Sequence, residues 1–199
     1  MQTEIEVKFC NVDIVDIREK LKASGAMLEQ PMRLMKRALI EEPHHEKENA
    51  FIRIRDEGDK TTLTFKRRDK LQGDTINNTK EIEVIVSDFE TTVELFREAG
   101  WEYKTFQESK RETWKLGDAE VVIDEWPWLK PYIEIEASTE DEVKQAAATL
   151  DFDWNDAIYG HIDMVYQMQY DFLDSVRGVI DLKEVRFQDP LPKVFKERS

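Results

Sequence analysis

The tripeptide Glu-Ile-Glu occurs three times in this chain, at positions 4–6, 81–83 and 134–136. Residues two apart in a β-strand point to the same face, about 6.6 Å from one another. Each tripeptide therefore places two carboxylates on one face of a strand and an isoleucine on the other. The pattern predicts three strands that each have an apolar face and an acidic face.

Basic side chains alternate in the same way in the segments between these tripeptides. These faces, two of which also carry a threonine, hold Arg53 and Arg55, then Thr64, Lys66 and Arg68, then Arg111, Thr113 and Lys115. On a flat exposed sheet so many charges would contribute little, because surface ion pairs add almost nothing to stability. A closed barrel brings the polar faces of all its strands to one interior. The sequence therefore predicts an α+β fold built on an eight-stranded antiparallel β-barrel with flanking helices.

The order of elements is read from periodicity and from turn and cap residues. Strands are expected at about 3–9, 32–40, 50–56, 61–68, 80–86, 106–116, 120–125 and 132–137. Helices are expected from a cap at Asn11 or Asp13 to Gly25, over 88–99, from the capping-box pair Thr139 and Glu142 to Leu150, and over 156–172. The segment 69–79 is expected to be a loop, and 178–187 has a strand-like pattern. We expect one barrel domain over residues 1–172 and a C-terminal extension over 173–199.

Composition narrows the class of protein. The net charge of −14 over 199 residues argues against a general nucleic-acid binder, which needs excess Lys and Arg on its docking surface. Cys10 is the one cysteine, so it is expected to be a structural thiol, with no intramolecular disulfide or cysteine-based zinc site. No apolar run is long enough for a signal peptide or a membrane span, which favours a cytoplasmic protein. The oligomeric state is open, with a homodimer as one option.

The residues expected on the charged face fall into three groups. Candidate metal ligands are the acids Glu4, Glu6, Asp124, Glu134 and Glu136. Candidate substrate-binding residues are the bases Lys8, Arg37, Arg53, Arg55, Lys66 and Arg111. Glu81 and Glu83 are candidate catalytic residues. Mg²⁺ binds one or two carboxylates and completes its shell with waters and phosphates, and a row of bases suits a linear polyphosphate. The set favours phosphoryl chemistry.

Other site chemistries have weaker signals. The chain contains neither a P-loop motif nor a Gly-x-Ser-x-Gly elbow. His44 and His45 are adjacent and expected to diverge, and His161 lies on a predicted helix, so structural roles are favoured for all three. The segment Trp126-Pro127-Trp128 either stacks a nucleobase or anchors a tight loop, and the second interpretation is favoured.

The motifs together resemble the CYTH superfamily, also called triphosphate tunnel metalloenzymes. The opening Glu4-x-Glu6-x-Lys8 is followed in order by Arg53-Ile54-Arg55, Leu63-Thr64-Phe65-Lys66, Glu81-Ile82-Glu83, Arg111 with Thr113-Trp114-Lys115-Leu116, Asp124 and Glu134-Ile135-Glu136. The resemblance covers roughly residues 1–170. It implies an eight-stranded tunnel, a requirement for Mg²⁺ or Mn²⁺, and a triphosphate substrate. It also implies that Glu4, Glu6 and Glu136 bind metal and that Lys8, Arg53, Arg55, Lys66 and Arg111 bind the triphosphate.

The chain departs from the family pattern at three places. Ser109 stands where many members have a lysine, with Lys110 beside it on the opposite face. The segment 37–43 lacks the Asp-Thr-Tyr-Tyr-Asp-x-Pro pattern of cyclase-like members. The segment 125–131 is not glycine-rich as it commonly is in the family. Recognition of a nucleobase is therefore the least transferable property.

Three functions are compatible with these residues. The first is metal-dependent hydrolysis of inorganic tripolyphosphate or an organic triphosphate. The second is a class IV adenylyl cyclase that converts ATP to cyclic AMP and pyrophosphate. The third is a non-catalytic module that binds polyphosphate or a nucleotide. The first is favoured, because a cyclase needs dedicated base and sugar contacts and a pure anion binder gains nothing from nearby acids.

Overall fold

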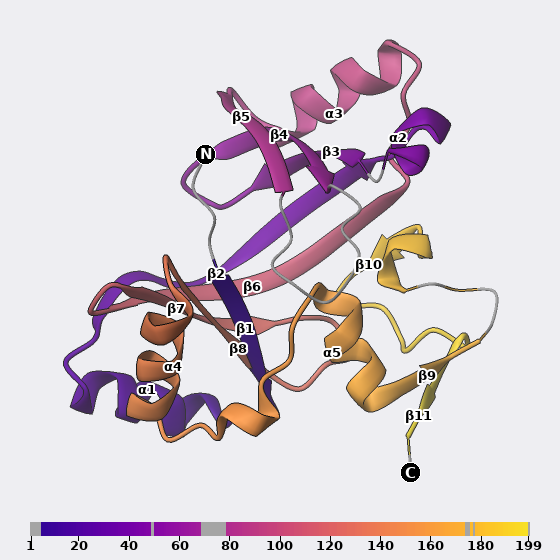
Figure 1. Ribbon diagram of the computed structural model, residues 1–199. Coiled ribbons are helices and arrows are strands. Elements are labelled where there is room, and N and C mark those ends of the chain that lie inside the picture. Colours follow the sequence, from indigo (N-terminus) through magenta and orange to yellow (C-terminus); the bar gives the residue numbers. More distant parts are fainter. Residues whose placement is uncertain (1–4, 49, 69–78, 174–175, 177, 199) are drawn as a thin grey trace. The chain divides into compact units, whose positions relative to one another are not determined.

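The computed structural model describes residues 5–48, 50–68, 79–173, 176 and 178–198 (Figure 1). The main strands are β1 (Ile5–Cys10), β2 (Met27–Ile40), β3 (Ala50–Asp56), β4 (Thr61–Arg68), β5 (Thr79–Val86), β6 (Thr105–Leu116), β7 (Ala119–Glu125) and β8 (Tyr132–Ala137). The α-helices are α1 (Ile14–Ala23), α2 (Pro43–Lys47), α3 (Phe89–Glu98), α4 (Glu140–Thr149) and α5 (Ile162–Gln169). The remaining strands are β9 (Tyr170–Phe172), β10 (Glu184–Val185) and β11 (Phe195–Glu197).

The eight main strands form a sheet in the order β1-β8-β7-β6-β2-β3-β4-β5. The pairs β1/β8, β8/β7, β7/β6, β2/β3, β3/β4 and β4/β5 are antiparallel. The short strand β10 adds to β6 in parallel. The predicted α+β fold with eight antiparallel strands is confirmed, and closure of the sheet into a barrel stays a prediction.

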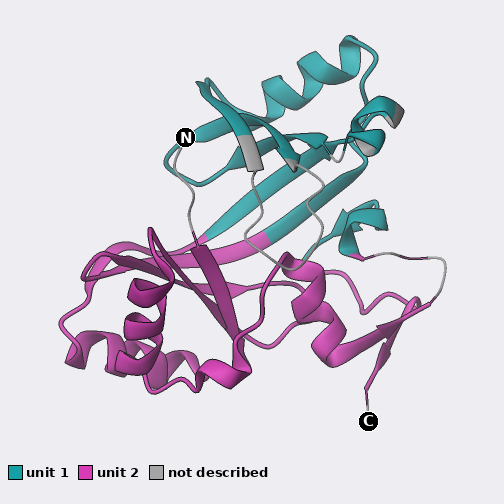
Figure 2. Cartoon of the chain, viewed as in Figure 1, with its two compact units in different colours: residues 1, 34–108, 179–186 teal, residues 2–33, 109–178, 187–199 magenta. Residues whose placement is uncertain are grey.

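The chain divides into two compact units (Figure 2). Unit 1 contains Leu34–Glu108 and Val179–Arg186, and unit 2 contains Gln2–Arg33, Ser109–Gly178 and Phe187–Ser199. Both β2 and β6 contribute residues to each unit. The division expected from the sequence, at residue 172, stays a prediction.

The core of unit 2 lies between the sheet and two helices. Val7 of β1 and Ile133 and Ile135 of β8 are fully buried against α1 and α4, which supply Leu21 and Val143 among others. Burying an aliphatic side chain of this size contributes about 1.5–3 kcal/mol. This packing makes one face of β1, β7 and β8 apolar. Figure 1 shows α1 and α4 on the same side of these strands.

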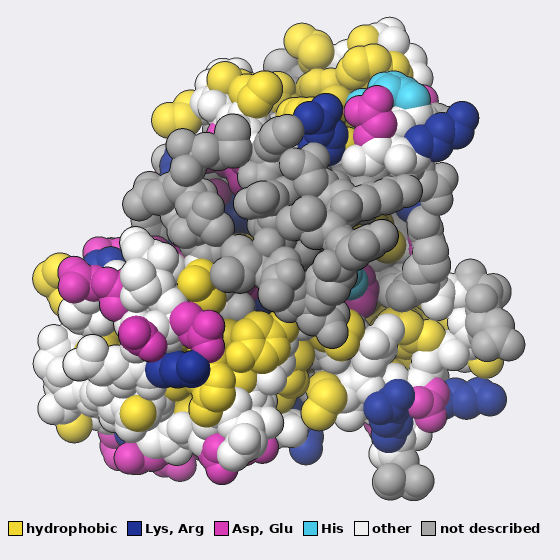
Figure 3. All heavy atoms as spheres, viewed as in Figure 1, with side chains coloured by type: hydrophobic (Ala, Val, Ile, Leu, Met, Phe, Trp, Pro, Cys, Tyr) yellow, Lys and Arg dark blue, Asp and Glu magenta, His cyan; other side chains and the backbone are white. Residues whose placement is uncertain are grey.

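The core of unit 1 is smaller and also forms where a helix packs on the apolar face of the strands. Ala38, Ile40 and Ile54 of β2 and β3 pack with Phe89 of α3 and Phe106 of β6. Beyond this cluster, Ile82, Val84, Ile85 and Leu95 are exposed, and Figure 3 shows hydrophobic side chains at the surface around α3 and β5. Helix α3 therefore covers the apolar face over β2 and β3 and leaves Ile82 and Val84 of β5 uncovered.

Helix caps explain where the helices start. Asp13 accepts hydrogen bonds from the backbone N–H groups of Val15 and Asp16, at 2.8 and 3.1 Å, and so caps α1. Asp88 caps α3 through the N–H of Thr91 at 2.7 Å. Both bonds of the predicted capping box between Thr139 and Glu142 are present at the start of α4.

Two expected elements have different bounds in the structure. Strand β2 begins at Met27, five residues before the expected start at Met32. The helix predicted over 156–172 is wrong at both ends, since α5 covers only Ile162–Gln169. At its start, Ile158 forms two backbone hydrogen bonds with Lys8, each 2.9 Å long, and Gly160 has a φ of 104°. At its end, residues 170–172 pair with β11 as a strand. Tertiary pairing outweighs the helical periodicity at both ends.

Helix α2, at Pro43–Lys47, was not expected from its polar sequence.

The C-terminal segment has little regular structure. The strand-like pattern over 178–187 becomes a 3₁₀ turn at Val179–Asp181 and the two-residue strand β10. Near the end of the chain, Phe195 of β11 packs against the rings of Tyr166, Tyr170 and Phe172, with centroids 4.9 to 5.7 Å from its own. This aromatic cluster ties the chain end to unit 2.

Candidate active site on two charged sheet faces

In unit 2, strand alternation separates the charged face from the core. Cross-strand pairing places Glu6 opposite Glu136 and Lys8 opposite Glu134, while Val7 is opposite Ile135. Since Val7 and Ile135 belong to the core, the four charged side chains share the other face. The faces predicted for β1 and β8 are therefore the observed ones.

Ion pairs connect the residues of this face into a chain. Lys8 forms an ion pair with Glu6, and its Nζ is 3.3 Å from Oε1 of Glu134. Glu134 Oε2 accepts a hydrogen bond from Nη2 of Arg111 at 2.6 Å. Arg111 also donates two hydrogen bonds to the carboxylate of Asp124, from Nε at 2.7 Å and from Nη2 at 2.6 Å. These ion pairs connect five of the predicted site residues, namely Glu6, Lys8, Arg111, Asp124 and Glu134.

The electrostatics keep Glu134 and Arg111 ionised. Burial raises the pKa of Glu134, but the charges of Arg111 and Lys8 outweigh it and lower that pKa to about 2. Burial likewise lowers the pKa of Arg111, while Asp124 and Glu134 raise it well above its ordinary value. Tyr132 donates a hydrogen bond to Oδ2 of Asp124 at 3.2 Å. At neutral pH the face therefore carries fixed charges of both signs in contact.

A row of acids lies across three adjacent strands of the same face. Glu136 of β8 is opposite Glu6 of β1 on one side and opposite Glu120 of β7 on the other. Like charges directly opposite one another destabilise a sheet, so a cation that bridges them would relieve the repulsion. Glu120 was not among the expected site residues, although its spacing of four residues from Asp124 puts both on one face of β7.

The acid row fits a hard divalent cation by its donor chemistry. Its carboxylate oxygens are the ligands that Mg²⁺ and Mn²⁺ prefer. Among the residues that the structure describes, no three His, Cys, Asp or Glu side chains already converge as a metal site. Glu4, the remaining predicted metal ligand, lies outside the described residues. The metal-binding roles of Glu6, Asp124, Glu134 and Glu136 stay predictions.

In unit 1, the charged face is formed by β2, β3, β4 and β5. Arg53 is 8% exposed, and its Nη2 is 3.6 Å from Oε1 of Glu81 and 3.8 Å from Oε2 of Glu83. Lys66 makes a closer ion pair with Glu81, at 2.7 Å. The hydroxyl of Thr64 donates to Oε2 of Glu83 at 2.8 Å. The two predicted catalytic acids are thus already partners of the predicted substrate-binding bases.

Two further bases lie beside them on this face. Arg37 of β2 is directly opposite Arg55 of β3. Nη1 of Arg55 is 3.7 Å from Oε1 of Glu57, which also contacts Lys60 at 3.6 Å. Burial and the nearby Arg53 lower the pKa of Lys66, against the effect of Glu81. All four predicted bases of unit 1 therefore gather on one face, with mutual repulsion that an anion would reduce.

The tryptophan segment after β7 is held by the protein itself. Trp126 is 3% exposed. Nε1 of Trp128 donates to the backbone oxygen of Asp189 at 2.8 Å, and Tyr170 donates to the backbone oxygen of Trp128. Trp128 also has a φ of 65°, a left-handed conformation that packing must hold in place. These contacts favour the loop-anchoring interpretation over base stacking.

Ser109 and Cys10 follow the alternation expected for them. Ser109 is 2% exposed and shares the face of Arg111, whereas Lys110 points to the other face, where it pairs with Glu125 at 3.5 Å. Cys10 is half-buried at the end of β1, and burial raises its pKa to about 11 despite the nearby Lys8. A thiol with this pKa is protonated at neutral pH and suits a structural role.

The three histidines contact groups that are not among the predicted site residues. His44 and His45 are in α2, with ring centroids 4.0 Å apart, and Nδ1 of His45 accepts from the N–H of Glu42 at 3.4 Å. Burial lowers the pKa of His45. His161 stands at the start of α5 and contacts Asp163 at 3.4 Å. The contacts of all three favour the structural roles expected from the sequence.

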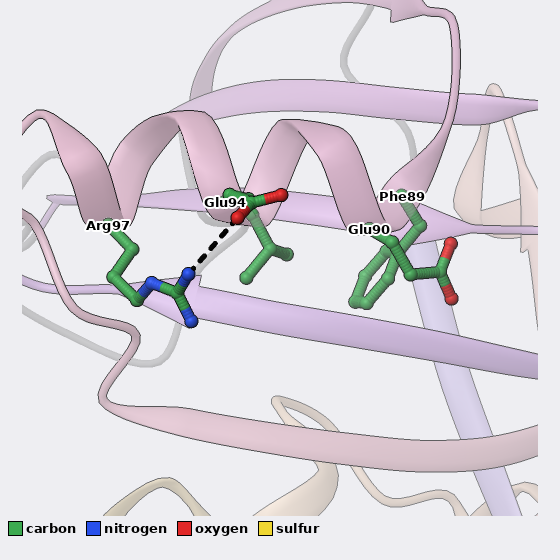
Figure 4. Close-up of a pocket in the computed structure, with 5 residues that line it drawn as sticks. Phe89, Glu90, Glu94 and Arg97 are labelled. Carbon is green, nitrogen blue, oxygen red and sulfur yellow. Dashed lines mark hydrogen bonds and ion pairs between the residues drawn. The ribbon is translucent and has the colours of Figure 1, made fainter.

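A shallow pocket of about 270 Å³ lies on α3, lined by Phe89, Glu90, Val93, Glu94 and Arg97 (Figure 4). Arg97 is engaged by Glu94 at 3.2 Å. With two acids and one paired base, this pocket lacks the charge for a polyphosphate. In the described part of the chain, no helix has the length and hydrophobicity that crossing a bilayer requires.

Comparison with known structures supports the fold. A conserved hypothetical protein from Pyrococcus furiosus aligns with a TM-score of 0.65 at 20% identity, over 81% of this chain and 99% of that one. A candidate adenylate cyclase from Vibrio parahaemolyticus aligns with a TM-score of 0.67 at 9% identity, over 83% and 98%. A candidate adenylyl cyclase from Hippeastrum, described as having a dominant triphosphatase activity, gives 0.50 at 16% identity, over 74% and 85%.

Two sequence comparisons gave different results. A search of curated protein sequences found no match, whereas a scan against family models did. The family model of the CYTH domain matches residues 2–157, which include β1 to β8 and the charged residues of both units. The chain therefore belongs to the CYTH domain family.

Proposed function

We propose that this protein is a metal-dependent triphosphatase that hydrolyses inorganic tripolyphosphate or an organic triphosphate. The observation that carries the proposal is the pairing of charge on the sheet: a CYTH domain presents an acid row on β1, β8 and β7 and a cluster of four bases on β2, β3 and β4. The acids suit a divalent cation and the bases suit a polyphosphate anion, and a metal-dependent triphosphatase has to bind both.

The acids of unit 2 would hold the metal. Glu4, Glu6 and Glu136 are the proposed ligands, and Asp124 and Glu134 lie on the same face, held by Arg111. Mg²⁺ or Mn²⁺ bound there would neutralise negative charge on the phosphate groups of the substrate.

The bases would bind the phosphate chain. Arg37, Arg53 and Arg55 can each offer a planar fork of N–H donors, which matches two phosphate oxygens. Lys8, Lys66 and Arg111 would add single charges or donors. Because Lys8 and Arg111 are already bonded to acids, their main effect would be to orient those acids. The unit 1 bases would do most of the direct phosphate binding.

Glu81 and Glu83 are proposed to orient the attacking water. Their side chains are 34% and 40% exposed, so each has a carboxylate that solvent reaches. Glu83 accepts a hydrogen bond from Thr64, which fixes one of its oxygens and leaves the other to accept from water. Their ion pairs with Arg53 and Lys66 keep them close to the residues that would bind phosphate.

The adenylyl cyclase remains the second candidate, favoured by the fold shared with the Vibrio parahaemolyticus protein. A cyclase must hold adenine and ribose so that the 3′-oxygen lies near the α-phosphorus. The two tryptophans that could stack adenine are buried or bonded to the tail. Hydrolysis needs no such contacts, and this favours the triphosphatase.

One experiment separates the candidates. The protein is incubated with Mg²⁺ or Mn²⁺ and either tripolyphosphate or ATP, and every product is identified by ion chromatography. Orthophosphate from tripolyphosphate, in excess over any product from ATP, is the expected result. Cyclic AMP with pyrophosphate would establish the cyclase instead. Tight binding without turnover would leave the binding module as the function.

A further inference from the structure

Two neighbouring rows of side chains on the charged face of unit 1 end differently. The first row runs from Leu39 through Arg53 and Thr64 to Glu83, across β2, β3, β4 and β5. The second row, here called the arginine row, runs across the same strands from Arg37 through Arg55 and Thr62 to Ile85. The first row thus ends in an acid, whereas the arginine row ends in an apolar side chain.

The hydroxyls of the two threonines differ accordingly. In the first row, the hydroxyl of Thr64 donates to Glu83 at 2.8 Å. In the arginine row, Thr62 is 0% exposed, and its hydroxyl has no hydrogen-bond partner among the described residues. A buried hydroxyl without a partner costs free energy of folding, so such a group calls for a ligand or another explanation.

The charges of the arginine row point to the kind of ligand. Arg37 and Arg55 are directly opposite each other, and like charges in that arrangement repel. An anion between the two guanidinium groups would turn the repulsion into attraction, and phosphate fits the fork of each arginine. Ile85 at the end of the row is 75% exposed, so the row is open to solvent on the β5 side.

We propose that Thr62 is a substrate-binding residue whose hydroxyl donates a hydrogen bond to a phosphate oxygen held by Arg37 and Arg55. The inference rests on the proposed function in one respect, namely that the anion is part of a triphosphate. It assigns this phosphate to the arginine row, where the hydroxyl of Thr62 lacks a partner among the described residues, rather than to the row of Arg53, where the hydroxyl of Thr64 already donates to Glu83. A phosphate oxygen has lone pairs that can accept this hydrogen bond, and the proton stays on the hydroxyl of Thr62.

The test measures binding of inorganic tripolyphosphate by isothermal titration calorimetry, without divalent metal, to the full chain. Thr62→Val keeps the shape and strand preference of threonine but removes the hydroxyl. Thr62→Ser keeps the hydroxyl. Thr61→Val is the matched control, because Thr61 is the preceding buried threonine on the opposite face. We expect Thr62→Val to weaken binding about tenfold, while Thr62→Ser and Thr61→Val stay within about twofold of the wild type.

Folding and function are checked separately. Replacing an unsatisfied hydroxyl by a methyl group should leave the melting temperature of Thr62→Val unchanged or raised. Normal binding by Thr62→Val, or equal losses in Thr62→Ser or Thr61→Val, would overturn the assignment. If that happens while the wild type still hydrolyses tripolyphosphate, the proposed function stands without it. If binding depends on the hydroxyl but no turnover occurs, the assignment stands and the triphosphatase does not.

Discussion

The two charged sheet faces differ in how their charges are compensated. In unit 2, Lys8 and Arg111 lie between Glu6, Glu134 and Asp124, so each base contacts two acids. In unit 1, Arg53, Arg55 and Lys66 also contact acids, but Arg37 is directly opposite Arg55 and the arginine row ends in Ile85. The same strand alternation therefore produces a face on which each base lies between two acids and a face on which two arginines are direct neighbours. The difference suggests a division of labour between metal binding and phosphate binding.

The largest expected effect tests the acid face. Removal of divalent metal with EDTA, or Glu6→Gln, should reduce tripolyphosphate hydrolysis more than a hundredfold, because Glu6 is a proposed metal ligand. Glu19→Gln on the exposed side of α1 is the charge-matched control and should retain full activity. Far-UV circular dichroism should be the same for all variants. Near-normal turnover by Glu6→Gln at low Mg²⁺ would show that the acid face does not bind the metal.

The second prediction concerns the base face. Arg55→Ala and Lys66→Ala should weaken tripolyphosphate binding about ten- to a hundredfold, and pyrophosphate binding less, because a longer anion contacts more of the bases. Arg67→Ala is the control, since Arg67 is next to Lys66 in β4 and has the opposite orientation. Calorimetry with both anions measures the difference. Equal losses for the two anions would mean that this face does not distinguish phosphate number.

The third prediction tests whether the ion pairs of unit 2 stabilise the fold. Glu134→Gln should lower the free energy of unfolding by about 2 kcal/mol at pH 7, since charged hydrogen bonds to Arg111 and Lys8 are lost. The folded-state pKa of Glu134 is about 2 and its ordinary value is 4.5. Its contribution is therefore present above pH 4.5 and is lost as the pH falls towards 2.

Urea unfolding of the wild type and of Glu134→Gln at several pH values measures this contribution. The difference in free energy between the two proteins should shrink steadily below pH 4.5. A difference that does not change with pH would mean that Glu134 acts through packing rather than through its charge.

The smallest expected effect concerns the tryptophan segment. Trp128→Phe removes the hydrogen bond to Asp189 and should cost about 1 kcal/mol of stability, measured by thermal unfolding. Turnover of tripolyphosphate at 25 °C should be unchanged. Loss of ATP-dependent cyclic AMP formation in this variant, with tripolyphosphate binding intact, would instead identify Trp128 as a base contact.

Much of the fold follows from local pattern. Period-two alternation fixes which residues of β1, β3, β4 and β8 share a face, because a shift of one residue would bury charge and expose the core. Caps at Asp13, Asp88 and Thr139 fix the starts of three helices. These signals lie within a few residues of the element they define, and so the sequence is enough.

What the sequence did not predict depends on distant contacts. The limits of α5 follow from pairing of Ile158 with Lys8 and of β9 with β11. Glu120 escaped notice because Val122 separates it from Asp124, so that β7 does not show a run of alternating acids. Its place in the acid row emerges only from the register with Glu136.

The backbone bridge between Lys8 and Ile158 bears on where a working chain can end. The family match stops at residue 157, yet Lys8 bonds through its N–H and C=O to Ile158 and through its ammonium group to the backbone oxygen of Gly160, at 2.8 Å. A protein shortened to residue 157 would keep all the matched motifs and lose these anchors of Lys8. We therefore expect the smallest autonomous form of this domain to extend beyond Gly160, so that the surroundings of Lys8 stay complete.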